Sequence, residues 1–182
     1  MFGRIQNIDK RVLDKISRIH KPALNKIMIT ASRAGNAGIV WWAICLPFLI
    51  NSNWRATGAN FVFGLAWAHL MGEIIIKHIV KRVRPCHTLD DDEQLIDRPR
   101  FYSFPSGHTT ASFAMVGVAL MRCRVITFMP ILMLAMLIAF SRIYLRVHYL
   151  TDVIAGMILG LTCGICSVLI FNTVVPMWFP MV

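Results

Sequence analysis

Long apolar runs separated by short charged segments restrict the fold of this chain more than any other feature. The runs at 57–80, 125–145 and 151–174 can each cross a ~30 Å hydrocarbon core as a helix, because a helix rises about 1.5 Å per residue. Hydrophobic residues make up 57% of the chain and charged residues 15%, whereas soluble domains carry about 45–50% and about 25%. The chain therefore needs a membrane as its solvent.

Two shorter apolar runs complete the pattern. The run at 37–51 is short for a span, and the run at 106–121 begins with polar residues, so both need their flanking residues or a thinned membrane to cross. We predict an all-α polytopic membrane helix bundle with about five crossings. A single domain covers 1–182, its transmembrane core is 37–174, and one long loop at 85–104 lies over the site.

The segment 1–36 has a different pattern, in which apolar residues recur every three or four positions with cations between them. The apolar set is Ile5, Ile8, Val12, Ile16 and Ile19. Such a pattern is typical of an amphipathic helix lying in the membrane interface, and a helix packed on the domain in water is the alternative. The segment lacks the continuous apolar core of a secretory signal peptide.

The formal charge of +10 does not indicate a nucleic-acid partner. The cations lie at the ends of apolar runs rather than across a hydrophilic surface. Membrane lipids with anionic head groups, and an anionic substrate, explain them better.

The five cysteines do not indicate a disulfide framework, because their number is odd and four lie in or beside apolar runs. Cys163 and Cys166 form a C-x-x-C inside an apolar helical run, with no second pair nearby. We expect both to pack as small hydrophobic residues.

Ionisable groups inside membrane spans are candidates for function, because they are costly to keep there. A first cluster ends the 57–80 run and includes Lys77, Arg84 and Pro85. Seven residues make almost two helical turns, which predicts Lys77 and Arg84 on one helix face, with Pro85 ending the helix. Two cations on one helix face are suited to bind an anion. Alternatively, the two side chains simply extend to the membrane surface to keep their charges in water.

A second cluster, 104–110, precedes an apolar helical run and contains Ser106, Gly107 and His108. Serine and proline there predict a helix start, and the unpaired N–H groups of a helix N-terminus can seat a phosphate. Gly107 allows close approach of the backbone. An ordinary helix cap with an incidental histidine is the alternative.

The third cluster joins two spans and includes Ser141, Arg142, His148 and Asp152. If the segment is helical, His148 and Asp152 lie one turn apart. The carboxylate can then hold one imidazole nitrogen and leave the other free to attack, as in a catalytic triad. Because the chain crosses and returns between clusters, all three fall at the same membrane face.

At these residues the chain resembles the membrane branch of the type 2 phosphatidic acid phosphatase (PAP2) superfamily. The family pattern is K-x6-RP, then PSGH, then SR-x5-H-x3-D. The matching residues are Lys77, Arg84, Pro85, Pro105 to His108, Ser141, Arg142, His148 and Asp152.

The resemblance implies a role for each matched residue. His148 is then the nucleophile that forms a phosphohistidine, Asp152 orients it, and His108 protonates the leaving oxygen. Phosphoryl oxygens are bound by Lys77, Arg84, Arg142, Ser106 and Gly107. Three cations and a helix N-terminus neutralise the charge that Mg²⁺ neutralises in other phosphoryl-transfer enzymes, so we expect no metal and no cofactor. The acidic run at 90–93 fits a solvated loop better than a magnesium site.

Three features lie outside the motif. Glu73 lies one turn before Lys77 and can pair with it. Gly156, Gly160 and Gly164 follow Asp152 in steps of four, which lets another helix approach closely. Arg146 can add a cation for a second phosphate or simply lie at the interface.

The substrate is expected to be a phospholipid or a polyprenyl phosphate, because the site opens at the membrane edge. Candidates are undecaprenyl diphosphate, phosphatidylglycerophosphate, phosphatidate and a lipid A phosphate. We expect a multi-pass protein of the cell membrane with its site on the extracytoplasmic face, as in the family. The eight cations of segment 1–36 lie on the site side and favour the opposite orientation by the positive-inside rule.

Other activities remain open at the level of sequence. A lipid phosphotransferase uses the same nucleophile with an alcohol in place of water. A vanadate-dependent haloperoxidase and a non-catalytic lipid-binding membrane protein are further alternatives.

Overall fold

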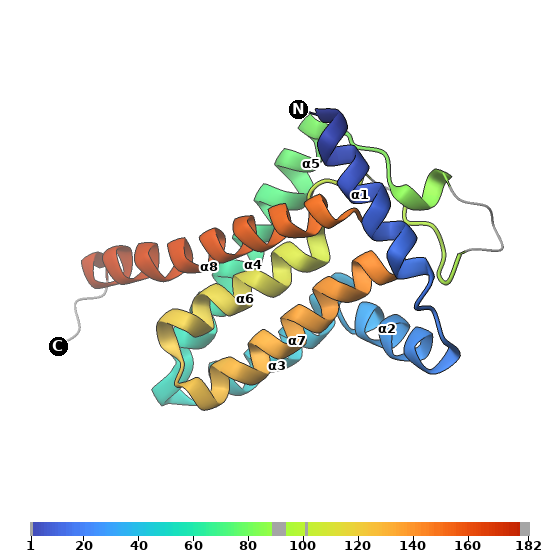
Figure 1. Ribbon diagram of the computed structural model, residues 1–182. Helices are drawn as coiled ribbons and strands as arrows, with labels where there is room; N and C mark the ends of the chain where they lie inside the picture. Colours follow the sequence, from blue (N-terminus) through green and yellow to red (C-terminus); the bar gives the residue numbers. More distant parts are fainter. Residues whose placement is uncertain (1, 89–93, 101, 179–182) are drawn as a thin grey trace.

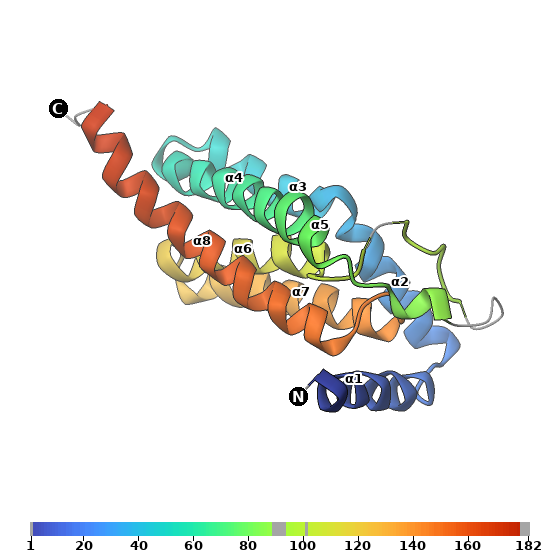
Figure 2. The same ribbon diagram turned by 90° about the horizontal axis from the view of Figure 1, so that it is seen from above.

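A computed structural model describes residues 2–88, 94–100 and 102–178, and every regular element in that part of the chain is helical. The long helices of the bundle run side by side (Figures 1 and 2). The α-helices are α1 Phe2–Ser17, α2 Pro22–Ala34, α3 Ile39–Ile50, α4 Arg55–His69, α5 Lys77–Val80, α6 Gly107–Arg122, α7 Val125–Tyr144 and α8 Leu150–Trp178.

The predicted all-α membrane bundle is confirmed, whereas the count of five crossings stays a prediction. Among the described residues, three stretches of helix are long and apolar enough to cross a membrane: Ser52–Thr88, Val125–Tyr144 and Leu150–Val174. A fourth is the pair α2 and α3, bent by 56° between them, if both belong to one span. Helix α6 has 16 residues and is about 24 Å long, which is short for a ~30 Å core.

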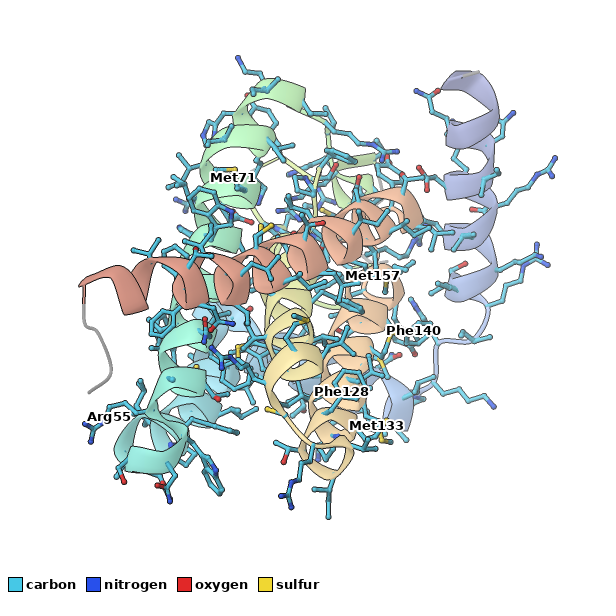
Figure 3. All side chains as sticks on the ribbon, turned by 90° about the vertical axis from the view of Figure 1, so that its left-hand side faces the viewer. Arg55, Met71, Phe128, Met133, Phe140 and Met157 are labelled. Carbon is cyan, nitrogen blue, oxygen red and sulfur yellow. The ribbon has the colours of Figure 1, made fainter. Side chains whose placement is uncertain are left out.

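The outer faces of the bundle are apolar. Met133 and Phe140 extend from the outer side of α7 (Figure 3) and are 68% and 40% exposed. Ile126 and Ile158 are 82% and 63% exposed. Side chains of this kind are stable at such positions when lipid tails rather than water surround them.

Helices α6 and α8 form the most extensive contact of the bundle. The stripe of small residues predicted from the sequence lies in this contact. A Cβ on Gly156 would come within 2.9 Å of the Ser106 carbonyl oxygen, and Cβ atoms on Gly160 and Gly164 would overlap carbonyl oxygens of α6. Only glycine therefore permits this approach, which brings the start of α8 beside the start of α6.

The bend between α2 and α3 lies at 35–38, where Ala37 (φ 49°) and Gly38 (φ 69°) are both left-handed. A second irregularity lies after α4, where the helix continues through a π-helical segment, Leu70–Ile76, into α5. Helix α5 ends at Val80, and the next residue, Lys81, is also left-handed (φ 49°). Breaks of this kind are common beside functional sites.

Helices α1, α2 and α5 lie at the same end of the bundle (Figures 1 and 2). Helix α1 packs its apolar side on the bundle, where Leu13 and Ile16 are buried, and exposes Lys10 and Lys15. The turn between α1 and α2 is held to the end of α7, where His20 Nε2 lies 3.0 Å from the Tyr144 carbonyl oxygen. The N-terminal helices thus pack beside the predicted site.

Candidate active site

Side chains from all three motifs meet at one cavity of about 530 Å³ at the α5 end of the bundle. Six of the eight predicted site residues line it: Lys77, Arg84, Gly107, His108, Arg142 and His148. The other two, Ser106 and Asp152, are fully buried and are not among the lining residues. The convergence inferred from the topology is present in the structure.

His148 is 1% exposed and presents one ring nitrogen to Arg84. Its Nε2 lies 2.9 Å from Nη1 of Arg84, which also donates to the carbonyl oxygen of Val147 at 3.1 Å. Because a guanidinium nitrogen only donates, Nε2 must accept, and the imidazole proton lies on Nδ1. The nitrogen beside the cation therefore carries the lone pair that a nucleophile needs.

The opposite nitrogen, Nδ1, faces Asp152 at 3.6 Å from Oδ2. The helical spacing predicted for this pair is wrong, because α8 begins at Leu150 and His148 lies in the preceding turn. The backbone N–H of His148 donates to the Arg142 carbonyl oxygen at 3.2 Å. Asp152 Oδ2 also accepts from the backbone N–H of Tyr149 at 2.9 Å. The carboxylate thus satisfies an unpaired donor at the helix start while facing the imidazole.

Burial lowers the pKa of His148 well below its ordinary value of 6.5, and the neighbouring cations Arg84, Arg142 and Lys77 lower this pKa further. Both effects disfavour the imidazolium form. His148 is consequently neutral, and able to act as a nucleophile, over the whole physiological pH range.

Lys77 is 3% exposed, and its Nζ lies 2.6 Å from both carboxylate oxygens of Glu73. The pairing of these two residues, predicted from their spacing, is confirmed. The shared helix face predicted for Lys77 and Arg84 is wrong. The helix ends at Val80, because the left-handed Lys81 turns the chain, and Arg84 reaches the cavity from a non-helical segment.

The start of α6 lies where the sequence predicts it. Ser106 is the N-cap residue, and Gly107 is the first helical residue. The Ser106 hydroxyl accepts from Thr109 Oγ1 at 3.0 Å, and the Ser106 backbone N–H donates to the Asp152 carbonyl oxygen at 3.1 Å. A Cβ on Gly107 would overlap the Glu73 carboxylate, so a larger residue there would displace Glu73 from its place beside Lys77.

His108 lies on the first turn of α6 and contacts the bend between α2 and α3. Its Nε2 lies 2.9 Å from Oδ1 of Asn36. A Cβ on Gly35 would come within 2.8 Å of His108 Cδ2, so the glycine makes room for the ring. The sequence does not mark Asn36 as a site residue, because this side chain is uncharged and precedes the first apolar run.

Arg142 is 4% exposed and donates from Nη1 to the hydroxyl of Ser32 on α2. A second opening, of about 690 Å³, is lined by His108, Arg142, Arg33, Asn36 and residues 94–99. The described part of the predicted loop 85–104 therefore borders the site. The acidic run at 90–93 lies outside the described residues.

Comparison with known proteins identifies this arrangement. The model of the PAP2 superfamily matches residues 57–176. The chain belongs to the PAP2 superfamily. The family resemblance drawn from the three motifs is confirmed.

Relatives of this PAP2 chain include lipid phosphatases. It is 32% identical over 177 residues to an undecaprenyl-diphosphatase of Sulfolobus acidocaldarius, covering 95% of this chain and 84% of the relative. It is 27% identical to phosphatidylglycerophosphatase B of Bacillus subtilis, with coverages of 86% and 80%.

Two solved structures share the fold of this PAP2 chain. LpxE of Aquifex aeolicus has a TM-score of 0.77 at 24% identity and covers 87% of this chain and 93% of its own. A transmembrane PAP2-type phosphatidylglycerolphosphate phosphatase of Bacillus subtilis has a TM-score of 0.75 at 22% identity, with coverages of 94% and 88%.

Several contacts at the PAP2 site come from outside the matched region. Ser32, Gly35 and Asn36 precede residue 57 and touch Arg142 or His108. Arg146 has a left-handed backbone (φ 55°) and does not line either opening. Its predicted contact with a second phosphate stays a prediction.

Proposed function

We propose that this chain is an integral membrane lipid phosphatase that acts through a phosphohistidine on His148. The observation that carries the proposal is one cavity that His108 and His148 line together with the cations Lys77, Arg84 and Arg142. Phosphoryl transfer requires charge neutralisation around phosphorus and an in-line nucleophile, and these side chains provide both.

The lone pair on His148 Nε2 attacks phosphorus, and the bond from phosphorus to the lipid oxygen breaks. Asp152 stabilises the positive charge that develops on the imidazole, in the manner of a triad carboxylate. A bound anionic phosphate favours the protonated form of His108, which gives its proton to the leaving oxygen. Water then loses a proton to His108 and attacks the phosphohistidine. The P–N bond breaks, and inorganic phosphate leaves with His148 neutral and His108 protonated again.

Lys77, Arg84 and Arg142 neutralise the phosphoryl oxygens during both steps, and the start of α6 at Gly107 adds backbone dipoles. Arg84 contacts Nε2 of His148, and a bound phosphoryl oxygen that accepts from this guanidinium would free the lone pair.

A lipid substrate is supported by the other wall of the cavity, which is apolar. Its lining includes Trp42, Leu65, Ala66 and Ala111. Trp42 is 46% exposed on α3, at a face that lipid tails can reach. We propose undecaprenyl diphosphate or a phosphatidylglycerophosphate or phosphatidate lipid as the substrate, in the cell membrane, with the site on the extracytoplasmic face.

Phosphate release from a panel of these lipids in detergent tests the proposal. Release that persists in EDTA, stops with vanadate and is absent from His148→Ala supports a metal-independent histidine mechanism. Release by His148→Ala equal to that of the unmodified protein, or loss in EDTA reversed by Mg²⁺, would contradict it.

A further inference from the structure

A partly buried ionic cluster joins α1, the segment after α5 and the start of α8. Arg82 donates from Nη2 to Oδ2 of Asp9 at 2.7 Å and from Nη1 to Oδ1 of Asp152 at 2.6 Å. Its guanidinium lies 4.0 Å above the ring of Tyr149. One arginine therefore bridges a carboxylate of the N-terminal helix and the carboxylate that faces the candidate nucleophile.

Asp9 lies on the buried side of α1. It is 0% exposed on the side that also buries Leu13 and Ile16, whereas a carboxylate on an amphipathic helix normally faces water. Its Oδ1 accepts from the backbone N–H of Thr151 at 3.1 Å, and its Oδ2 accepts from the Thr151 hydroxyl at 2.7 Å. Asp9 thus caps the first turn of α8 at Thr151, the residue that precedes Asp152.

The two carboxylate oxygens of Asp152 have different partners. Oδ1 is held by Arg82, and this leaves Oδ2 for the backbone N–H of Tyr149 and for Nδ1 of His148. Ser103 also hydrogen-bonds to Asp152, but without the guanidinium the carboxylate loses its ion pair and can rotate away from the imidazole. Arg82 therefore fixes which oxygen faces the nucleophile.

The charge of Asp9 matters as much as its contacts. Arg82 alone would offset the negative charge of Asp152 at short range, and this charge is what stabilises a histidine that becomes positive. With Asp9 on its other side, the cluster of one guanidinium and two carboxylates keeps one negative charge beside His148. The N-terminal helix thereby contributes to the electrostatics of the site.

We propose that Asp9 and Arg82 are positioning residues that hold Asp152 in its orientation and preserve its charge for His148; this rests on the function proposed above. They touch neither the substrate nor the reacting atoms. Their effect must therefore appear in the chemical step and pass through Asp152.

The test is Asp9→Asn in the lipid phosphatase assay, with Asp14→Asn as the matched control because Asp14 is an exposed carboxylate on the same helix. Removing a triad carboxylate lowers kcat about 10⁴-fold, and for a residue one contact further away we expect a loss of about tenfold. KM and the inhibition constant of inorganic phosphate should stay within about twofold, because loss confined to kcat marks an effect on the transition state. Asp14→Asn should match the unmodified protein.

A second comparison isolates the route through Asp152. In an Asp152→Asn background, Asp9→Asn should cause no further loss, because residues that act as a unit are not additive. The proposal would be overturned if Asp9→Asn left kcat unchanged, or if Asp9→Asn lowered kcat about tenfold again in the Asp152→Asn background. It would also be overturned if the inhibition constant of inorganic phosphate rose by the same factor as kcat fell. If Asp9→Asn does not fold, Arg82→Lys decides in the same assay, since lysine cannot bridge both carboxylates; a normal kcat would overturn the proposal. Absence of His148-dependent phosphate release from the unmodified protein would instead refute the proposed function.

Discussion

Substituting Gly156 by alanine tests whether close packing of α8 on α6 sets the geometry of the site. The added Cβ would lie 2.9 Å from the Ser106 carbonyl oxygen, 3.1 Å from Thr109 Cβ and 3.2 Å from Thr110 Oγ1. The first is a backbone atom and cannot move alone. An ordinary contact needs about 3.4 Å, so the start of α6 must move about 0.5 Å away from α8.

Two effects on stability oppose each other in this variant. Overpacking costs about 1–3 kcal/mol, and replacing glycine by alanine inside a helix returns about 1 kcal/mol. The net loss of about 1 kcal/mol lowers Tm by about 2–4 °C in a chain of this size. Turnover should suffer more, because a misplacement of about 1 Å can reduce a rate about 10²-fold; for half that distance we expect about tenfold.

The assay measures kcat and Tm of purified Gly156→Ala in detergent, beside Gly64→Ala as the matched control. The two nearest atoms to a Cβ on Gly64 would be the side-chain atoms Ser167 Oγ and Val118 Cγ2, both at 3.3 Å, and the nearest backbone atom, Gly164 Cα, would lie at an ordinary 3.6 Å. We expect the control to keep its kcat. If Gly156→Ala keeps both kcat and Tm, the contact between α6 and α8 does not set the site geometry.

Three further predictions follow from single contacts. Because burial and nearby cations lower the pKa of His148, the neutral nucleophile persists below pH 6.5, and the acid limb of kcat/KM should lie below that value in a pH profile; a limb above 6.5 would contradict this. Asn36→Ala should slow hydrolysis of an alkyl phosphate more than that of a nitrophenyl phosphate with the same tail, because only the poor leaving group needs the proton of His108; equal losses would separate Asn36 from this step. Ser32→Ala removes a hydroxyl that orients Arg142 and should raise the inhibition constant of inorganic phosphate severalfold, as expected for a charge-assisted hydrogen bond; an unchanged constant would show that Arg142 is held without Ser32.

The sequence predicts the helices and the motif residues because both depend on local patterns. Apolar runs predict the long helices, and the spacing of Lys77, Arg84, His108 and His148 predicts which segments meet at the cavity. The pairing of Lys77 with Glu73 also follows from helical spacing.

The contacts between distant segments were not predictable in the same way. Asp9 reaches Arg82, and Asn36 reaches His108, only after the chain folds. Asp9 lies on the apolar side of α1 with Leu13 and Ile16, but nothing in the sequence shows which cation a carboxylate there will reach. Local breaks were missed for a related reason. The left-handed Lys81 ends α5 before Arg84, and lysine carries no signal for that conformation.

Rapid quenching of turnover with a ³²P-labelled lipid phosphate, followed by mapping of the labelled peptide, tests most directly which group attacks phosphorus. We predict an acid-labile, base-stable label on His148 that forms and decays at rates compatible with kcat, and that accumulates in His108→Ala when a good leaving group is used. A label on another residue, or full turnover without any labelled protein, would contradict the nucleophile assigned to this site.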